Sequence, residues 1–197
     1  MENWQEDVKR CVDFHGHLCP GLALGIVAAR AGLSELGVSR AGDEEVVSCV
    51  ETNACCADAV QVLSGSTFGK GNFIFKDVGK IAVTFISREQ DTAVRLCLKP
   101  DTVSLSAPHQ ALMGKVMKEA ASEEEIAEFW RLHHQRAEEI LSTPWNTLFS
   151  MNAVSPSMPP KAKIEPSFLC DQCGEPVMAS RLQQIGSKAV CSTCSKD

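Results

Sequence analysis

Tyrosine is absent from the 197-residue chain, and aromatic residues together make up only 6% of it. Long apolar runs are also absent, because no stretch approaches the roughly 20 apolar residues of a membrane-spanning helix. The first residues, Met1–Asp7, are acidic and polar, unlike a secretory signal peptide. We therefore expect a cytoplasmic protein without a membrane partner.

The chain has no excess of positive charge. It carries 19 Lys and Arg residues against 25 Asp and Glu residues, a formal net charge of −6. This balance argues against general binding to a phosphate backbone, so nucleic acid is not an expected partner. The apolar content of 44% suits a packed core. The length allows one ordinary domain and a small appendage.

Cysteine, by contrast, is plentiful, with ten residues in the chain. Without an export signal, these cysteines are expected in a reducing compartment. There they bind metals or take part in chemistry more often than they form disulfides.

The stretch Asp13–Gly21 places two imidazoles and a thiol within five residues. Proline is favoured at the first helical position, so Pro20 predicts a helix start with Cys19 at its N-cap. Helical spacing of apolar residues then continues to Leu36, at Leu22, Ile26, Ala29 and Leu33. The helix dipole is expected to lower the pKa of Cys19, and His17 is close enough to bind the same ion. The alternative is a loop with a buried cysteine and incidental histidines.

A second thiol is predicted at another helix start. Residues 46–51 form a short β-branched strand, and a helix is expected over 54–64 with Thr52 or Asn53 as its N-cap. Cys55 would then lie in the first turn, where the dipole again favours thiolate.

The neighbours of Cys55 are interpreted from helical geometry. Asp58 lies three residues on, so it shares a helix face with Cys55. Cys56 lies about 100° further round and is interpreted as a core residue.

The glycine-rich stretch 65–72 fails as a phosphate loop, because its glycine spacing is wrong and Lys70 is followed by Gly71. Either it presents Lys70 and backbone N–H groups to an anionic ligand, or it is a simple turn.

These patterns predict an α+β fold, with an antiparallel or mixed sheet flanked by helices. Beyond the elements above, we expect a helix over 3–14, strands over 73–75, 80–87 and 92–98, a helix over 108–120, a helix opened by the Ser122/Glu125 capping box, and a further strand within 145–154. His133 falls on the apolar stripe of the last helix and is interpreted as a satisfied core histidine. His109 and His134 carry no motif.

The C-terminal segment contains two CxxC pairs, Cys170/Cys173 and Cys191/Cys194, separated by seventeen residues. This spacing is typical of a four-cysteine zinc ribbon, and a redox pair would not explain two such motifs. A segment of about thirty residues has too little core to fold alone, so structural zinc is expected to stabilise it.

Proline-rich residues 155–167 form the expected stiff linker. The predicted domains are therefore a core over 1–154, this linker, and a ribbon over 168–197. From Phe168 onward the ribbon has three basic and three acidic residues. Contact with a protein is thus at least as good an interpretation of the ribbon as contact with nucleic acid.

Three segments together resemble one family. HGHLCPG (His15–Gly21), the stretch Val50–Lys80 and the trailing ribbon are similar to the FmdE-like proteins, a family named after one subunit of formylmethanofuran dehydrogenase. The resemblance covers most of residues 5–150. It implies an α+β core, often followed by a zinc ribbon, and a homodimer.

The resemblance also implies a core site. It is marked by His17, Cys19 and Cys55, with His15, Asp58, Lys70, Lys76 and Asp77 nearby. The sequence departs from the family at Ser66, where relatives often have cysteine, and at the additional thiol of Cys56. Both departures leave the ligand set open.

Three functions follow as hypotheses. The first is a metal-binding accessory subunit or partner of a molybdenum or tungsten enzyme of one-carbon metabolism, whose pterin cofactor is carried by other subunits. The second is a free-standing metal-dependent enzyme with an open His17/Cys19/Cys55 site holding zinc, nickel or iron. Its catalytic residues would be Cys19, Cys55, Asp58 and Lys70. The third is a metal or redox sensor with the ribbon as its regulatory module.

Overall fold

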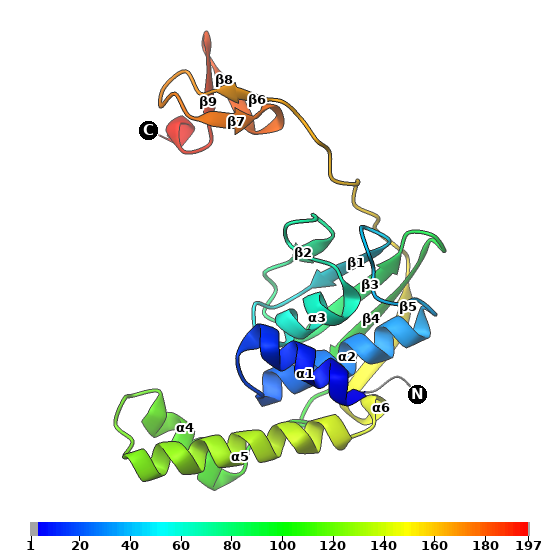
Figure 1. The fold of residues 1–197 in the computed structure, drawn as a ribbon, viewed down its shortest axis with the longest axis vertical. Helices are drawn as coiled ribbons and strands as arrows, with labels where there is room; N and C mark the ends of the chain where they lie inside the picture. Colours follow the sequence, from blue (N-terminus) through cyan, green and yellow to red (C-terminus); the bar gives the residue numbers. More distant parts are fainter. Residues whose placement is uncertain (1–3, 197) are drawn as a thin grey trace. The chain divides into compact units, whose positions relative to one another are not determined.

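The computed structural model describes residues 4–196. They divide into two compact units, the first ending at Lys161 and the second beginning at Ala162 (Figure 1). None of the helices in residues 4–196 combines the length and apolar character needed to cross a membrane.

The first unit is built on a five-stranded mixed sheet with strand order β2-β1-β3-β4-β5. The strands are β1 (Val46–Val50), β2 (Phe73–Phe75), β3 (Ala82–Ser87), β4 (Thr92–Leu98) and β5 (Phe149–Val154). β1 and β2 are parallel, and the other neighbouring pairs are antiparallel. The predicted α+β class and mixed sheet are confirmed, as is the hairpin between β3 and β4.

Within residues 4–161, six helices accompany this sheet. They are α1 (Trp4–His15), α2 (Pro20–Glu35), α3 (Cys56–Ser64), α4 (Ala107–Val116), α5 (Glu123–Ser142) and the short α6 (Trp145–Leu148). α2 and α3 cover one face of the sheet, with α1 packed outside them (Figure 1). α4 and α5 form a helical hairpin, and α5 also packs against α2.

α2 is the central helix of the core. The sequence predicted a single apolar stripe, but eleven of its sixteen residues are buried. The predicted buried surface of α2 was too narrow, because the helix packs against the sheet, α3 and α5 at once. Two glycines permit this close packing. A Cβ on Gly25 would lie 2.4 Å from the backbone oxygen of Cys56, and one on Gly32 would lie 2.3 Å from the Phe85 ring.

The opposite face of the sheet carries a smaller apolar cluster, formed by Val47, Cys49, Ile86 and Ala93. Met158 packs against this cluster, and Arg88 donates to the Pro159 carbonyl at 2.9 Å. The first part of the proline-rich segment therefore belongs to the first unit.

α5 begins with the predicted capping box, in which Ser122 and Glu125 bond each other's backbone. Its predicted apolar stripe is only partly buried. Phe129 is buried, whereas Ile126 and Trp130 are 39% and 42% exposed. The N-terminal half of α5 thus presents apolar side chains to solvent.

The second unit contains two small hairpins. Its elements are β6 (Ser167–Leu169), β7 (Pro176–Met178), the 3-10 turn η1 (Ala179–Arg181), β8 (Leu182–Ile185), β9 (Lys188–Cys191) and the 3-10 turn η2 (Cys194–Lys196). Its buried apolar residues are Cys170, Val190 and Cys191. So small a core leaves the four cysteines as the structural centre of this unit.

Candidate functional site

The turn between α1 and α2 gathers three metal-binding side chains. α1 ends at His15, and Gly16 then adopts a positive φ of 97° that few other residues tolerate. Cys19 caps α2 as predicted, with Pro20 directly after it. Donor atoms of His15, His17 and Cys19 all lie within 4.8 Å of one another. We refer to these three residues as the His-Cys group.

Asp58 on α3 orients His15. Its Oδ2 lies 2.7 Å from Nδ1 of His15, while Nε2 of the same ring lies 3.9 Å from the Cys19 sulfur. A carboxylate on one ring nitrogen fixes the histidine tautomer and directs the other nitrogen toward a metal. Asp58 therefore orients His15 without itself being one of the three grouped donors.

The Cys19 thiol is held by its own helix, since the Leu22 N–H donates to its sulfur at 3.3 Å. The expected lowering of its pKa is nevertheless wrong. Burial raises the pKa of Cys19 to about 11, although the Leu22 and Gly21 N–H groups lower it and neighbouring Cys55 raises it further. Desolvation outweighs the helix terminus here. A bound cation would reverse this balance.

Cys55 lies beside Cys19, across Gly21. A Cβ placed on Gly21 would lie 3.6 Å from the Cys55 sulfur and 3.9 Å from the Cys19 sulfur. Cys55 is half-buried and is not among the residues whose donor atoms all lie within 4.8 Å. Of the predicted ligands, the structure thus groups His17 and Cys19 directly with His15 and places Cys55 next to them.

The start of α3 differs from its prediction. The helix begins at Cys56, and Cys55 itself is the N-cap, without a capping side-chain hydrogen bond. Thr52 does not cap the helix as expected, because its hydroxyl accepts a hydrogen bond from the Ala54 N–H in a local turn. Cys55 therefore precedes the first helical turn.

Two residues that made the ligand set uncertain are core residues. Cys56 is buried, and burial raises its pKa to about 11. Ser66 is fully buried, donates to the Val46 carbonyl at 3.0 Å and lies 3.0 Å from the Ser48 hydroxyl.

The predicted lysines are engaged or exposed elsewhere. Lys70 donates to the carbonyl oxygens of Gly42 and Asp43, at 3.4 and 2.9 Å. These bonds tie the glycine-rich loop to the chain before β1. Lys76 and Asp77 are exposed after β2. Within residues 4–196, the Lys70 side chain therefore donates its hydrogen bonds to backbone carbonyls and not to the His-Cys group.

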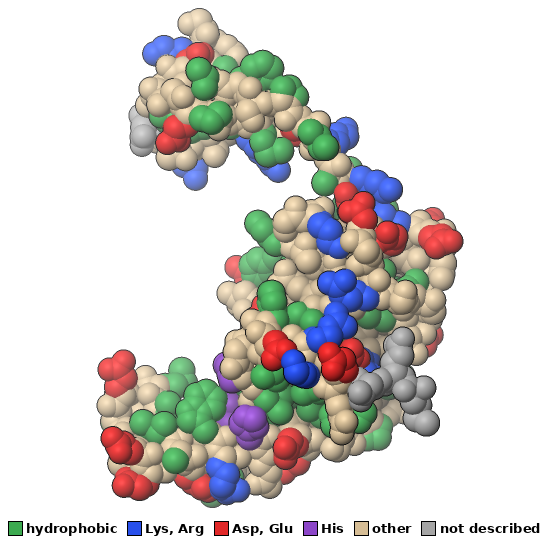
Figure 2. Space-filling view, in the orientation of Figure 1, with side chains coloured by type: hydrophobic (Ala, Val, Ile, Leu, Met, Phe, Trp, Pro, Cys, Tyr) green, Lys and Arg blue, Asp and Glu red, His purple; other side chains and the backbone are tan. Residues whose placement is uncertain are grey.

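Sequence patterns missed the contribution of α5. The Trp130 ring lies edge-on to His17, with centroids 5.4 Å apart, and His133 also packs edge-on against Trp130. His109 Nε2 is 2.9 Å from His133 Nδ1, a pairing that α4 and α5 create. Figure 2 shows histidine side chains gathered where α5 approaches the core. Only the i, i+3 spacing of Trp130 and His133 hinted at a shared face.

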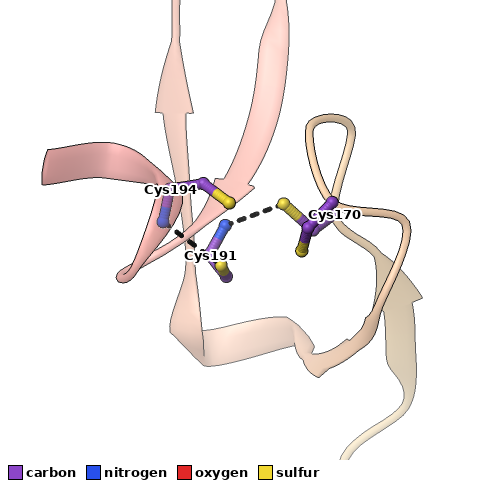
Figure 3. A group of neighbouring side chains, drawn as sticks. Cys170, Cys191 and Cys194 are labelled. Carbon is purple, nitrogen blue, oxygen red and sulfur yellow. Dashed lines mark hydrogen bonds between the residues drawn. The ribbon is translucent and has the colours of Figure 1, made fainter. Parts of the chain in front are cut away.

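The second group of donors is the four-cysteine cluster: Cys170, Cys173, Cys191 and Cys194. The Cys191 N–H donates to the Cys170 sulfur at 3.3 Å, and the Cys194 N–H donates to the Cys191 sulfur at 3.4 Å (Figure 3). The backbone N–H groups of Cys173 and Cys191 lower the pKa of the Cys170 thiol to about 6. Gly174 supplies the tight turn after the first pair, with a φ of 75°. Four sulfurs at this separation fit a closed tetrahedral zinc site.

Comparison with known proteins identifies the family. The family model described as "FmdE, Molybdenum formylmethanofuran dehydrogenase operon" matches residues 14–150, a span that contains the whole His-Cys group. The chain belongs to the FmdE family. The four-cysteine cluster lies outside the FmdE match.

Two individual proteins are similar to this FmdE chain. A "Probable S-adenosyl-L-methionine-binding protein" of Archaeoglobus fulgidus is 31% identical over 190 residues, covering 88% of this chain and 49% of the relative. The chain thus spans about half the length of that curated relative. A crystal structure of a tungsten formylmethanofuran dehydrogenase FmdE-like protein from Syntrophus aciditrophicus is 23% identical, with a TM-score of 0.63. That match covers 98% of this chain and 91% of the other, and it supports the fold.

Proposed function

We propose that this FmdE protein is a metal-binding accessory subunit or partner of a molybdenum or tungsten enzyme of the formylmethanofuran dehydrogenase type, in one-carbon metabolism. The metal-binding part of this proposal is supported by the His-Cys group, in which the Asp58 carboxylate contacts the His15 ring. The family description supports the association with the larger enzyme.

The donor chemistry supports a transition metal in the core. Two imidazoles and a thiolate suit zinc, nickel or iron, and a bound metal would supply the positive charge that stabilises the Cys19 thiolate. Cys55 is the nearest further donor. If it binds, the site closes with four protein ligands. If it does not, the fourth position is open, as in catalytic zinc sites.

Metal content per chain tests the two-site proposal. The full-length protein is loaded with zinc, and bound metal is measured by elemental analysis. We expect two zinc ions per chain, of which Cys19→Ser loses one and Cys173→Ser loses the other. Retention of both ions by Cys19→Ser would place the second ion elsewhere and overturn the core site.

Association with the larger enzyme is a separate test. The purified protein is mixed with the catalytic subunits of a formylmethanofuran dehydrogenase, and the mass of the complex is measured by light scattering during gel filtration. Co-elution supports the accessory role. Separate elution, together with an open core metal, would favour the free-standing enzyme instead.

We further propose that the protein is a homodimer. Support comes from the exposed apolar side chains of the α4–α5 hairpin, including Met117 at 78% exposure and Trp130 at 42%. A face of this kind is typical of an interaction site. Sedimentation of the wild type and of Met117→Glu tests this, with a dimer and a weakened dimer expected.

A second candidate function is binding of S-adenosyl-L-methionine, which the Archaeoglobus fulgidus relative is named for. One observation on this chain favours it: an open groove of about 810 Å³, away from the His-Cys group, lined by arginines, carboxylates and apolar side chains. Pockets of this size accommodate ligands as large as a nucleoside carrying an amino acid. Calorimetric titration of the protein with S-adenosyl-L-methionine tests the function itself.

A further inference from the structure

Two cysteine sulfurs from different helix starts meet beside Gly21. A Cβ placed on Gly21 would lie 3.9 Å from the Cys19 sulfur and 3.6 Å from the Cys55 sulfur. Because glycine has no side chain, nothing at residue 21 separates the two thiols. Neither cysteine is in a disulfide, and the Cys55 thiol is close enough to raise the pKa of the Cys19 thiol. The starts of α2 and α3 therefore bring a pair of reduced thiols together.

The Cys55 side chain is free to turn toward Cys19. Cys55 is the N-cap of α3, but its side chain makes no capping hydrogen bond. Rotation of this side chain therefore removes no cap from the helix. A disulfide needs its two Cβ atoms about 3.5–4.5 Å apart. The Cys55 Cβ already lies 3.1 Å from the position of a Gly21 Cβ, next to the Cys19 sulfur. The two sulfurs can thus approach mainly by side-chain rotation.

The two thiols differ in their access to solvent. Cys55 is half-buried, whereas only 3% of the Cys19 surface is exposed. A dissolved reagent therefore reaches the Cys55 sulfur first, and Cys19 reacts with a neighbour inside the protein. This is the usual division between the accessible thiol of a redox pair and its resolving thiol. Cys56 is buried in the core and does not offer the same access.

A base for the inner thiol is also in place. His15 Nε2 lies 3.9 Å from the Cys19 sulfur, and the Asp58 carboxylate lies 2.7 Å from the other ring nitrogen. A histidine oriented in this way can take the proton of a thiol while that thiol attacks. The buried Cys19 thiol therefore has a route for its proton.

We propose that Cys19 and Cys55 form a reversible disulfide when the core holds no metal. The oxidant is a low-molecular-weight disulfide. The Cys55 sulfur attacks one of its sulfurs, forms a mixed disulfide and releases one small thiol. The Cys19 sulfur then attacks the Cys55 sulfur, which forms the Cys19–Cys55 bond and releases the second small thiol. The protein pair loses two electrons, the reagent gains them, and the two thiol protons end on the released thiols.

This disulfide is a switch for the core metal site, a role that rests on the proposed metal binding at the His-Cys group. A Cys19 sulfur bonded to Cys55 no longer provides a thiolate, so the site keeps only its two imidazoles and binds metal more weakly. A bound metal in turn occupies the Cys19 sulfur. Metal binding and disulfide formation therefore oppose each other by the same factor.

Peptide mapping of the full-length protein tests the bond. Metal-free and zinc-loaded protein are incubated with oxidised glutathione, the remaining thiols are alkylated, and disulfide-linked peptides are identified by mass spectrometry. We expect the Cys19–Cys55 link in the metal-free protein, its loss after reduction, and its absence from the zinc-loaded protein. Cys55→Ser should lose the link, whereas the matched control Cys56→Ser should keep it.

The outcomes distinguish the disulfide from the metal site. A Cys19 that stays reduced in metal-free protein, or that links to another cysteine, would overturn the proposed bond and leave the test of zinc content unaffected. Equal linkage with and without zinc, in protein that binds two zinc ions per chain, would overturn the switch. If the link forms but Cys19→Ser still binds both ions, the proposed core metal site fails and the disulfide stands.

Discussion

Asp58 illustrates how one residue acts through another. It does not belong to the His-Cys group, but its carboxylate lies 2.7 Å from His15 Nδ1. We predict that Asp58→Asn weakens metal binding at this group about 10- to 100-fold, the usual effect of losing such a partner. Competition with a chromophoric chelator measures this, using Cys173→Ser protein to isolate the core site.

Asp13→Asn provides the control for Asp58. Asp13 is an exposed carboxylate that pairs with Lys9 on the same helix. Its substitution changes the net charge by the same amount without touching His15. An equal loss of metal affinity in both variants would mean that Asp58 acts only through long-range charge.

The adjacent thiols Cys55 and Cys56 should behave differently. We predict that Cys55→Ser weakens or removes metal at the core, whereas Cys56→Ser leaves the metal and lowers stability by about 1 kcal/mol through lost apolar burial. Elemental analysis and urea unfolding of both variants provide the measurements. The reverse pattern would contradict the assignment of Cys56 to the core.

Residue-level prediction from the sequence succeeded where local rules apply. Proline at a helix start predicted the position of Cys19 as the N-cap of α2. It failed where contacts come from distant segments. The pairing of His109 with His133 and the approach of Trp130 to His17 depend on how α5 packs, which no local pattern encodes.

At the scale of elements, close packing of α2 against α3 depends on Gly25. We predict that Gly25→Ala destabilises the protein by about 1–3 kcal/mol, because its Cβ would lie 2.4 Å from the backbone oxygen of Cys56, which cannot easily move. Urea unfolding measures the change.

Gly114→Ala is the opposite case on α4. A Cβ there meets nothing within 4 Å, so the higher helix propensity of alanine should stabilise the protein by about 0.5–1 kcal/mol. Equal effects of the two substitutions would show that the contact at Gly25 is easily relieved.

The α4–α5 hairpin should weaken in acid. Burial lowers the pKa of His109 from its ordinary value of 6.5, and Arg136 adds to this. The unfolded chain therefore takes up a proton at a higher pH than the folded chain does. Stability from neutral His109 is complete above about pH 6.5 and is lost as the pH falls below it.

This loss can be followed by urea unfolding of the metal-free protein between pH 7.5 and pH 5. We expect His109→Gln to lose less stability than the wild type over that range. His134→Gln, which changes a neighbouring histidine on α5, should follow the wild type. Parallel loss in all three proteins would exclude His109 as the source.

Elements were well predicted where the periodicity was strong. The strands β3 and β4 and the capping box of α5 follow directly from alternation and from Ser122 with Glu125. The start of α3 was wrong because Thr52 bonds within its own turn instead of capping the helix. The burial of α2 on nearly all sides exceeded its apolar stripe, since small residues such as Ala23 and Ala28 pack as well as leucine does.

At the scale of the whole molecule, we propose that the ribbon folds independently of the core. Its few buried apolar residues cannot stabilise it without metal. We predict that Cys170→Ser unfolds the segment from Ala162 onward and leaves the core signals of an amide NMR spectrum unchanged. Cys97→Ser, which removes a half-buried core thiol, is the control. Collapse of the whole spectrum in Cys170→Ser would contradict separate folding.

The position of Cys19 has a thermodynamic consequence. The same sulfur caps α2, the central helix of the first unit, and belongs to the His-Cys group. A metal that binds only the folded chain adds a stabilising free energy of RT ln(1 + [M]/Kd). The melting temperature of the core should therefore rise with the free metal concentration, so that heating the protein at a series of metal activities reads out the affinity of the site without any spectroscopic signal from the metal.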